Sequence, residues 1–180
     1  MPWIRQRLRQ LKLLVFDVDG VLTDGALLYG PDGQIWRRFD ARDGMAMKLL
    51  QQSGLQLAWI SGGCGESIAR RAQDLGITHC FAEVKDKSAV LNGLQQKFGH
   101  TAVKTAFVGD DLNDLVVRPH VGLLITPADA AQSVRRQADL VLRSSGGQGA
   151  VRELAERILR LRGDWAELER WGWRQRNCVD

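Results

Sequence analysis

Short runs of uninterrupted apolar residues recur along the chain and alternate with segments of helical periodicity. These runs are Leu13–Phe16, Leu55–Ile60, Thr78–Phe81, Thr105–Asp110, Val121–Thr126 and Ala138–Leu142. A strand in a parallel sheet is covered by helices on both faces, so its sequence is apolar throughout rather than alternating. The pattern therefore predicts an α/β fold, a three-layer doubly wound parallel sheet with helices on both faces.

One segment interrupts this alternation. Residues 26–39 contain two strand-like arms around Gly-Pro-Asp-Gly, which is typical of a β-hairpin. The hairpin begins shortly after the first apolar run and should project near the end of that strand. The chain has 180 residues, 44% of them hydrophobic and 26% charged, which fits one domain over residues 1–180. We expect a helical tail at about 163–180 that packs Trp165, Trp171 and Trp173 on the domain or on another subunit.

Composition narrows the class of partner and the compartment. The net charge of +4 suits an anionic small molecule and is weak support for nucleic acid. Cys64, Cys80 and Cys178 show no paired or metal-type spacing and indicate free thiols in a reducing compartment. The basic N-terminal segment precedes only a short apolar run without a cleavage site, and no segment approaches transmembrane length. We therefore expect a cytoplasmic protein without a membrane or nucleic-acid partner.

Chemically useful side chains follow four successive apolar runs. Asp17 and Asp19 follow the first run, Ser61 and two glycines follow the second, Lys87 follows the third, and residues 109–114, Gly-Asp-Asp-Leu-Asn-Asp, end the fourth. In doubly wound sheets ligands bind at the carboxyl ends of the strands. We therefore expect these residues to form one site.

The residue types in this set favour metal-assisted phosphoryl transfer. Asp17 and Asp19 point to the same side of an extended chain and would repel each other unless a cation or a proton is shared. With Asp110 or Asp111 they form an all-oxygen set suited to Mg²⁺. Ser61 and Lys87 can hold a phosphoryl group while an aspartate attacks it in line. The alternative of a calcium-binding EF-hand loop from Asp17 fails because its twelfth residue is not glutamate.

The order and spacing of these residues resemble the four motifs of haloacid-dehalogenase-type phosphatases. The matching segments are Asp-Val-Asp-Gly-Val-Leu-Thr at 17–23, Ser61, Lys87 and residues 109–114. The resemblance implies the Rossmann-like fold of that family and a magnesium-dependent phosphatase that forms an aspartyl-phosphate. It implies that Asp17 is the nucleophile and a metal ligand, and that Asp19 is the general acid and base.

The same resemblance implies the remaining roles around the phosphoryl group. The backbone carbonyl of Asp19 and the side chain of Asp110 would complete the protein's metal ligands. Ser61 would hydrogen-bond the phosphoryl group and Lys87 would neutralise it. Asp111 and Asp114 would support the metal ligands from outside the coordination sphere.

Within that family the chain is similar to a branch without a separate cap domain, whose members dephosphorylate 3-deoxy-D-manno-octulosonate 8-phosphate (KDO 8-phosphate) in lipopolysaccharide synthesis. The similarity includes the hairpin, residues 39–50 with their Arg-Asp-Gly, and residues 146–153. It implies a homotetramer held by the hairpins, with a neighbouring subunit as lid. The implied substrate-binding residues are Asp19, Asp40, Ala41, Arg42, Asp43, Gly44, Lys48, Gly62, Arg71 and Lys87.

Two positions depart from that branch, which usually has arginine where this chain has Gly63 and Gln148. An arginine there would recognise an anionic substrate with a bidentate hydrogen bond. A nonulosonate 9-phosphate or a broader range of sugar phosphates therefore remains an alternative substrate. So does a non-catalytic regulatory or assembly module. Asp43 could also simply cap the helix that follows it, since aspartate is a favoured N-cap.

Overall fold

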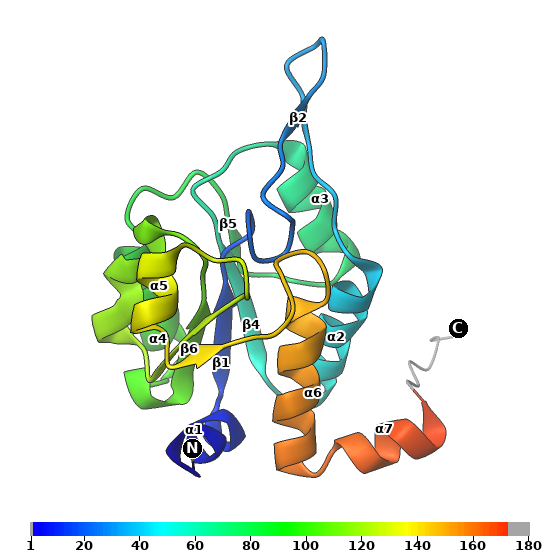
Figure 1. The fold of residues 1–180 in the computed structure, drawn as a ribbon, viewed down its shortest axis with the longest axis vertical. Helices are drawn as coiled ribbons and strands as arrows, with labels where there is room; N and C mark the ends of the chain where they lie inside the picture. Colours follow the sequence, from blue (N-terminus) through cyan, green and yellow to red (C-terminus); the bar gives the residue numbers. More distant parts are fainter. Residues whose placement is uncertain (1, 173–180) are drawn as a thin grey trace.

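The computed structural model describes residues 2–172 and is built around a six-stranded sheet (Figure 1). The strands are β1 (Leu13–Phe16), β4 (Gln56–Ile60), β5 (Cys80–Phe81), β6 (Thr105–Val108), β7 (Leu123–Thr126) and β8 (Leu140–Val141). All of them pair in parallel, in the order β5-β4-β1-β6-β7-β8. The first strand of the chain is thus central, with β4 on one side and β6 on the other.

Helices cover both faces of this sheet, as the apolar runs predict. They are α1 (Pro2–Gln10), α2 (Ala41–Gln52), α3 (Glu66–Asp74), α4 (Lys87–Phe98), α5 (Gln132–Gln137), α6 (Ala150–Arg162) and α7 (Trp165–Trp171). One hydrophobic cluster packs α2, α3 and α6 against Leu14 and Phe16 of β1, and the other packs α4 against Leu13 and Val15. The doubly wound α/β prediction is confirmed.

Local sequence explains where several of these helices begin and end. Asp86 caps α4 by accepting a 3.0 Å hydrogen bond from the Ala89 N–H, and α4 ends at Gly99 in the left-handed region. Residues 112–117, which the sequence predicts as helical, lie in a 3₁₀ helix, η2 (Leu112–His120), that contains Pro119. A second 3₁₀ turn, η1 (Ala102–Lys104), leads into β6. The apolar pattern does not predict α1 at all.

The interruption after β1 is a two-stranded hairpin, as predicted. β2 (Leu28–Tyr29) pairs antiparallel with β3 (Ile35–Trp36), and the tip projects beyond the body of the domain (Figure 1). Leu28, Tyr29 and Trp36 are 58%, 69% and 53% exposed. The interval between β1 and β4 holds this hairpin and α2, and the interval between β4 and α4 holds α3 and β5.

The last described helix packs its first tryptophan on the domain. Trp165 is buried, and the guanidinium groups of Arg152 and Arg160 lie 5.3 and 4.7 Å from its ring centroid. Trp171 is half exposed, whereas Trp173 and Cys178 lie outside the described residues. Between residues 2 and 172, every helix is too short or too polar to cross a bilayer.

Candidate active site

Asp17 stands at the carboxyl end of the central strand. Its backbone N–H bonds the Val108 carbonyl of β6 at 2.9 Å, which continues the sheet pairing by one residue. Asp17 is only 5% exposed, and Oδ1 of its carboxylate accepts a 2.8 Å hydrogen bond from the Val18 N–H. The fold therefore fixes an acidic group at the carboxyl edge of the sheet, where its side chain has little freedom to rotate.

Lys87 is the first residue of α4, and it points into the same space. Its Nζ lies 3.1 Å from Asp17 Oδ1 and 2.6 Å from Asp114 Oδ1, and the residue is only 2% exposed. Burial by itself would lower the pKa of Lys87, but the two carboxylates raise it overall. The lysine is thus a fixed positive charge beside the Asp17 carboxylate.

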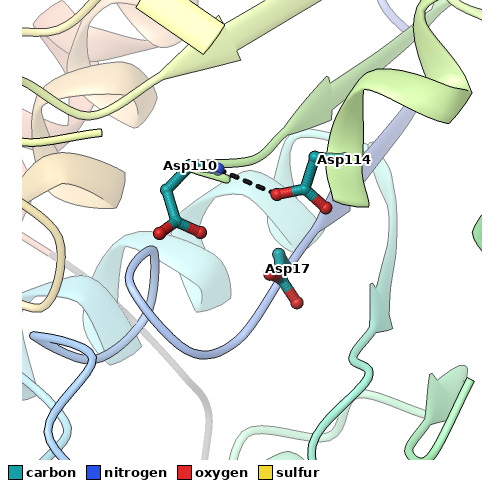
Figure 2. A group of neighbouring side chains, drawn as sticks. All are labelled: Asp17, Asp110 and Asp114. Carbon is teal, nitrogen blue, oxygen red and sulfur yellow. Dashed lines mark hydrogen bonds between the residues drawn. The ribbon is translucent and has the colours of Figure 1, made fainter. Parts of the chain in front are cut away.

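Asp110 and Asp114 approach Asp17 from the end of β6 (Figure 2). Each of the three carboxylates places an oxygen within 4.8 Å of the other two. Asp114 is already occupied, because Oδ1 binds Lys87 and Oδ2 accepts the N–H groups of Asp110 and Asp111 at 2.9 and 3.3 Å. Asp114 therefore supports the other carboxylates, as the sequence indicates for this position.

Asp110, by contrast, has an oxygen that no group among residues 2–172 satisfies. Its Oδ1 is buried and has no hydrogen-bond partner in the structure. Buried polar atoms are almost always paired, so an orphan of this kind points to a missing ligand. Carboxylate oxygens from Asp17 and Asp110 are the donors that Mg²⁺ prefers. The residues present fit the predicted magnesium site.

The pKa values of the clustered carboxyl groups also support a cation site. Burial, followed by the charge of Asp114, raises the pKa of Asp17 to about 7. Burial, followed by the charges of Asp17 and Asp114, raises the pKa of Asp110 to about 8. Without a cation these two acids resist ionising together. A bound divalent cation would offset the free-energy cost of ionising both acids.

Gly20 lies in the loop after β1, where the Asp110 side chain packs closely against the backbone. It adopts φ +84°, and a Cβ at this position would lie 2.0 Å from Asp110 Oδ2. Both the left-handed backbone and the missing side chain are therefore needed. The glycine of the first motif serves the packing of the metal site.

The Asp19 carboxylate does not join this cluster. It faces Arg37 in the return arm of the hairpin, which donates from Nε to Oδ1 at 2.6 Å and from Nη2 to Oδ2 at 3.0 Å. Such a two-point contact fixes the orientation of the carboxylate. The side chain of Asp19 therefore lies apart from the three clustered carboxylates, and metal binding by its backbone carbonyl stays a prediction.

Ser61 directly follows β4 and lies beside this pair. Its side chain is buried, and its Oγ accepts a 3.0 Å hydrogen bond from the Gly63 N–H. A Cβ on Gly62 would make only ordinary contacts, whereas one on Gly63 would lie 2.5 Å from Asp19 Oδ2 and 2.8 Å from Arg37 Nη2. A side chain at position 63 would therefore have to displace the ends of the Asp19 and Arg37 side chains.

The predicted substrate segment lies at the N-terminus of α2. Asp40 is the N-cap and accepts a 2.6 Å hydrogen bond from the Arg42 N–H, while its carboxylate pairs with the exposed Arg42 guanidinium at 2.7 Å. That hydrogen-bonded guanidinium lowers the pKa of Asp40. Ala41 is exposed, and Gly44 leaves room for Arg71, whose Nη2 donates to the Asp40 carbonyl at 3.3 Å.

Asp43 turns inward rather than toward the solvent. It is 3% exposed, and its two oxygens accept the N–H groups of Gly149 and Arg152 at 3.2 and 2.8 Å. Burial raises the pKa of Asp43. It therefore caps α6 across the domain, whereas Asp40 caps its own helix. Lys48 lies two turns along α2, where it lines a hollow with Gln73 and Asp74.

Two functional contacts escape sequence reasoning. The role of Asp43 as a cap for α6 leaves no local signal, because its partners are more than 100 residues away. Arg37 is distinguished only in the structure, where Ile35, Arg37 and Phe39 are partly buried while Trp36 and Arg38 are exposed. This period of two places Arg37 on the inner side of the hairpin arm.

Comparison with known proteins places this geometry in a family. No protein-family model matches the chain. The 3-deoxy-D-manno-octulosonate 8-phosphate phosphatase of Haemophilus influenzae is 38% identical over 160 residues, 89% of each chain. A crystal structure of the Moraxella catarrhalis enzyme of that name, in complex with magnesium, phosphate and KDO, superposes with a TM-score of 0.90 at 35% identity.

That superposition covers 94% of this chain and 98% of the Moraxella chain. A cobalt-bound structure of the Haemophilus enzyme superposes with a TM-score of 0.85 at 39% identity, covering 88% and 92% of the two chains. The likeness thus extends over most of the chain. The chain belongs to the 3-deoxy-D-manno-octulosonate 8-phosphate phosphatase family of haloacid-dehalogenase-type phosphatases.

Proposed function

We propose that this protein is a magnesium-dependent phosphatase that hydrolyses KDO 8-phosphate to KDO and phosphate, as a step of lipopolysaccharide synthesis in the cytoplasm. The observation that carries the reaction type is the meeting of Asp17, Lys87 and Asp110 at the carboxyl ends of β1 and β6. The substrate is supported by the names of the relatives and by the KDO in the Moraxella structure.

The first half of the reaction transfers the phosphoryl group to the protein. A carboxylate oxygen of Asp17 forms a bond to phosphorus as the bond from phosphorus to the C8 oxygen of the sugar breaks. Asp19 gives its proton to that departing oxygen, so the sugar leaves as an alcohol. Lys87 and the Ser61 hydroxyl hold the phosphoryl oxygens during the transfer.

The second half returns Asp17 to its starting state. Asp19, now ionised, takes a proton from a water molecule as the water oxygen bonds to phosphorus. The bond from phosphorus to the Asp17 oxygen breaks, and inorganic phosphate leaves. Magnesium, held by Asp17, Asp110 and the Asp19 backbone carbonyl, would neutralise charge on the phosphoryl oxygens.

The test is phosphate release from a panel of sugar-acid phosphates with Mg²⁺. We expect the highest kcat/KM for KDO 8-phosphate. A nonulosonate 9-phosphate is the second candidate, because Gly63 and the exposed Gln148 lack the charge of an arginine. A higher kcat/KM for that substrate would replace the first proposal. No phosphate release from any of the panel would contradict both and leave a non-catalytic module.

We further propose a homotetramer in which the hairpins meet and a neighbouring subunit closes the site. Exposed apolar side chains that cluster on one projecting element mark an interaction surface, and Leu28, Tyr29 and Trp36 form such a cluster. A two-stranded hairpin is also only marginally stable without packing partners.

Light scattering tests this assembly. We expect the wild-type protein to have the mass of four chains of 20.1 kDa. The double variant Tyr29→Asp, Trp36→Glu places charged residues on the hairpin. Its mass should be lower than that of the wild type, and its KM should be higher because the lid is lost. Val103→Asp changes a comparably exposed apolar residue away from the hairpin and should leave the mass unchanged. A wild-type monomer with full activity would contradict the shared lid.

A further inference from the structure

Arg37 has a buried side chain, and each nitrogen of its guanidinium donates a hydrogen bond beside the catalytic loop. Its side chain is 1% exposed. Nε and Nη2 bind the two oxygens of Asp19 at 2.6 and 3.0 Å, and Nη1 donates to Ser67 Oγ at 3.1 Å. An arginine is costly to desolvate, so a buried one with every nitrogen placed indicates a position that the fold is built to hold.

The contacts of Ser67 anchor this guanidinium to rigid elements. The Ser67 hydroxyl, in the first turn of α3, donates to the Ile35 carbonyl of β3 at 3.1 Å. Arg37 is thus tied to the hairpin arm that carries it and to a helix of the domain. The Asp19 carboxylate is held from outside its own loop by two elements that meet there.

The second motif leaves room for this arrangement. A Cβ on Gly63 would lie within 2.8 Å of both Arg37 Nη2 and Asp19 Oδ2. The backbone of Gly63 does not need a positive φ, so space rather than conformation makes this position a glycine. The loop after β4 therefore accommodates the Arg37–Asp19 pair.

Asp19 and Arg37 differ in how far their side chains are exposed. The Asp19 side chain is 27% exposed, whereas that of Arg37 is 1% exposed. A substrate can therefore contact Asp19 but meets Arg37 only through it. We propose that Arg37 is a positioning residue that orients the Asp19 carboxyl group so that, when protonated, it gives its proton to the leaving-group oxygen. The inference rests on the proposed function, because it assigns Asp19 the proton transfer of that reaction.

The dependence on leaving group separates this role from a general structural one. A sugar phosphate leaves as an alkoxide and needs the proton, whereas 4-nitrophenyl phosphate leaves as a stable phenolate and does not. In Arg37→Met we expect kcat/KM to fall about 100-fold for the sugar phosphate but less than about 5-fold for the nitrophenyl ester. Arg37→Lys keeps a cation without the two-point contact and should fall between wild type and Arg37→Met on the sugar phosphate.

Two neighbouring positions complete the experiment. Arg38→Met removes the adjacent, exposed arginine, which pairs with Asp24, and should leave both activities unchanged. Gly63→Ala displaces the Arg37–Asp19 pair without removing a charge and should show the same selective loss, which keeps the test valid if Arg37→Met does not fold. Gly93→Ala, on α4 with open space around it, is its control.

The outcomes separate the inference from the function that it rests on. Equal losses on the two esters, or no loss on either, in both Arg37→Met and Gly63→Ala would overturn the positioning role. A wild-type protein that hydrolyses neither ester would instead overturn the proposed function, and the inference with it. A selective loss of kcat/KM on the sugar phosphate, partly restored by Arg37→Lys, supports the positioning role of Arg37.

Discussion

Replacing Asp17 by asparagine should abolish phosphate release, with kcat lowered by at least about 10,000-fold. The amide cannot form the bond to phosphorus that the carboxylate forms, and Asp110, the neighbouring carboxylate with an unpaired oxygen, would hold the metal. Asp19 is held by Arg37, and the oxygens of Asp114 are bound by Lys87 and two backbone N–H groups. Steady-state kinetics with KDO 8-phosphate measure the effect.

The variant should nevertheless fold. Asp17 is one of three carboxylates that crowd a buried space, and its pKa is raised first by burial and then by the repulsion of Asp114. Removing one negative charge relieves that repulsion, so the melting temperature of metal-free Asp17→Asn should match or exceed that of the wild type. Asp24→Asn, in the same loop but paired at the surface with Arg38, is the control and should keep full activity. Substantial turnover by Asp17→Asn would rule out Asp17 as the nucleophile.

Removal of magnesium should abolish activity and should also change how stability depends on pH. The folded-state pKa values of Asp17 and Asp110 are about 7 and about 8, above the usual 3.8. The metal-free folded protein therefore binds more protons than the unfolded chain between about pH 4 and pH 8. The free energy of unfolding falls as pH rises through that window. Both acids must then lose their protons, although burial and the repulsion between them disfavour the charged forms.

Melting curves from pH 4 to pH 9, with a chelator or with Mg²⁺, measure this effect. The melting temperature of the metal-free protein should fall as the pH rises towards 8, and Mg²⁺ should raise it most at the alkaline end. Asp110→Asn removes one of the two titrating acids and should flatten the metal-free curve. A metal-free protein that gains stability between pH 5 and pH 8, or that keeps its activity in chelator, would contradict the magnesium site.

The sheet and the position of the site could be predicted from sequence because both have local signals. Leu13–Phe16 is apolar at every position and is buried at every position, so the run by itself indicates a strand covered on both sides. Asp17, Lys87 and Asp110 each follow such a run or begin the helix after it. The parallel topology then brings them together, because all the strands end at the same edge.

What the sequence does not give is the partner of each polar side chain. Asp43 lies in a segment that suggests substrate binding, yet its oxygens accept N–H groups from the start of α6. Arg37 has no motif at all, and only its position on the inner side of the hairpin arm distinguishes it from Arg38. Contacts of this kind depend on how separate elements meet in space, which neither spacing nor periodicity encodes.

The Asp43 contact also has a consequence for how the chain folds during synthesis. The carboxylate belongs to the first third of the sequence, but the N–H groups that it needs are 106 and 109 residues further on. A nascent chain that ends before α6 cannot satisfy this acid, and it leaves the apolar face of α2 without its partner helix. Because contacts so distant in sequence form late, α2 should become protected from hydrogen exchange only after α6 has left the ribosome.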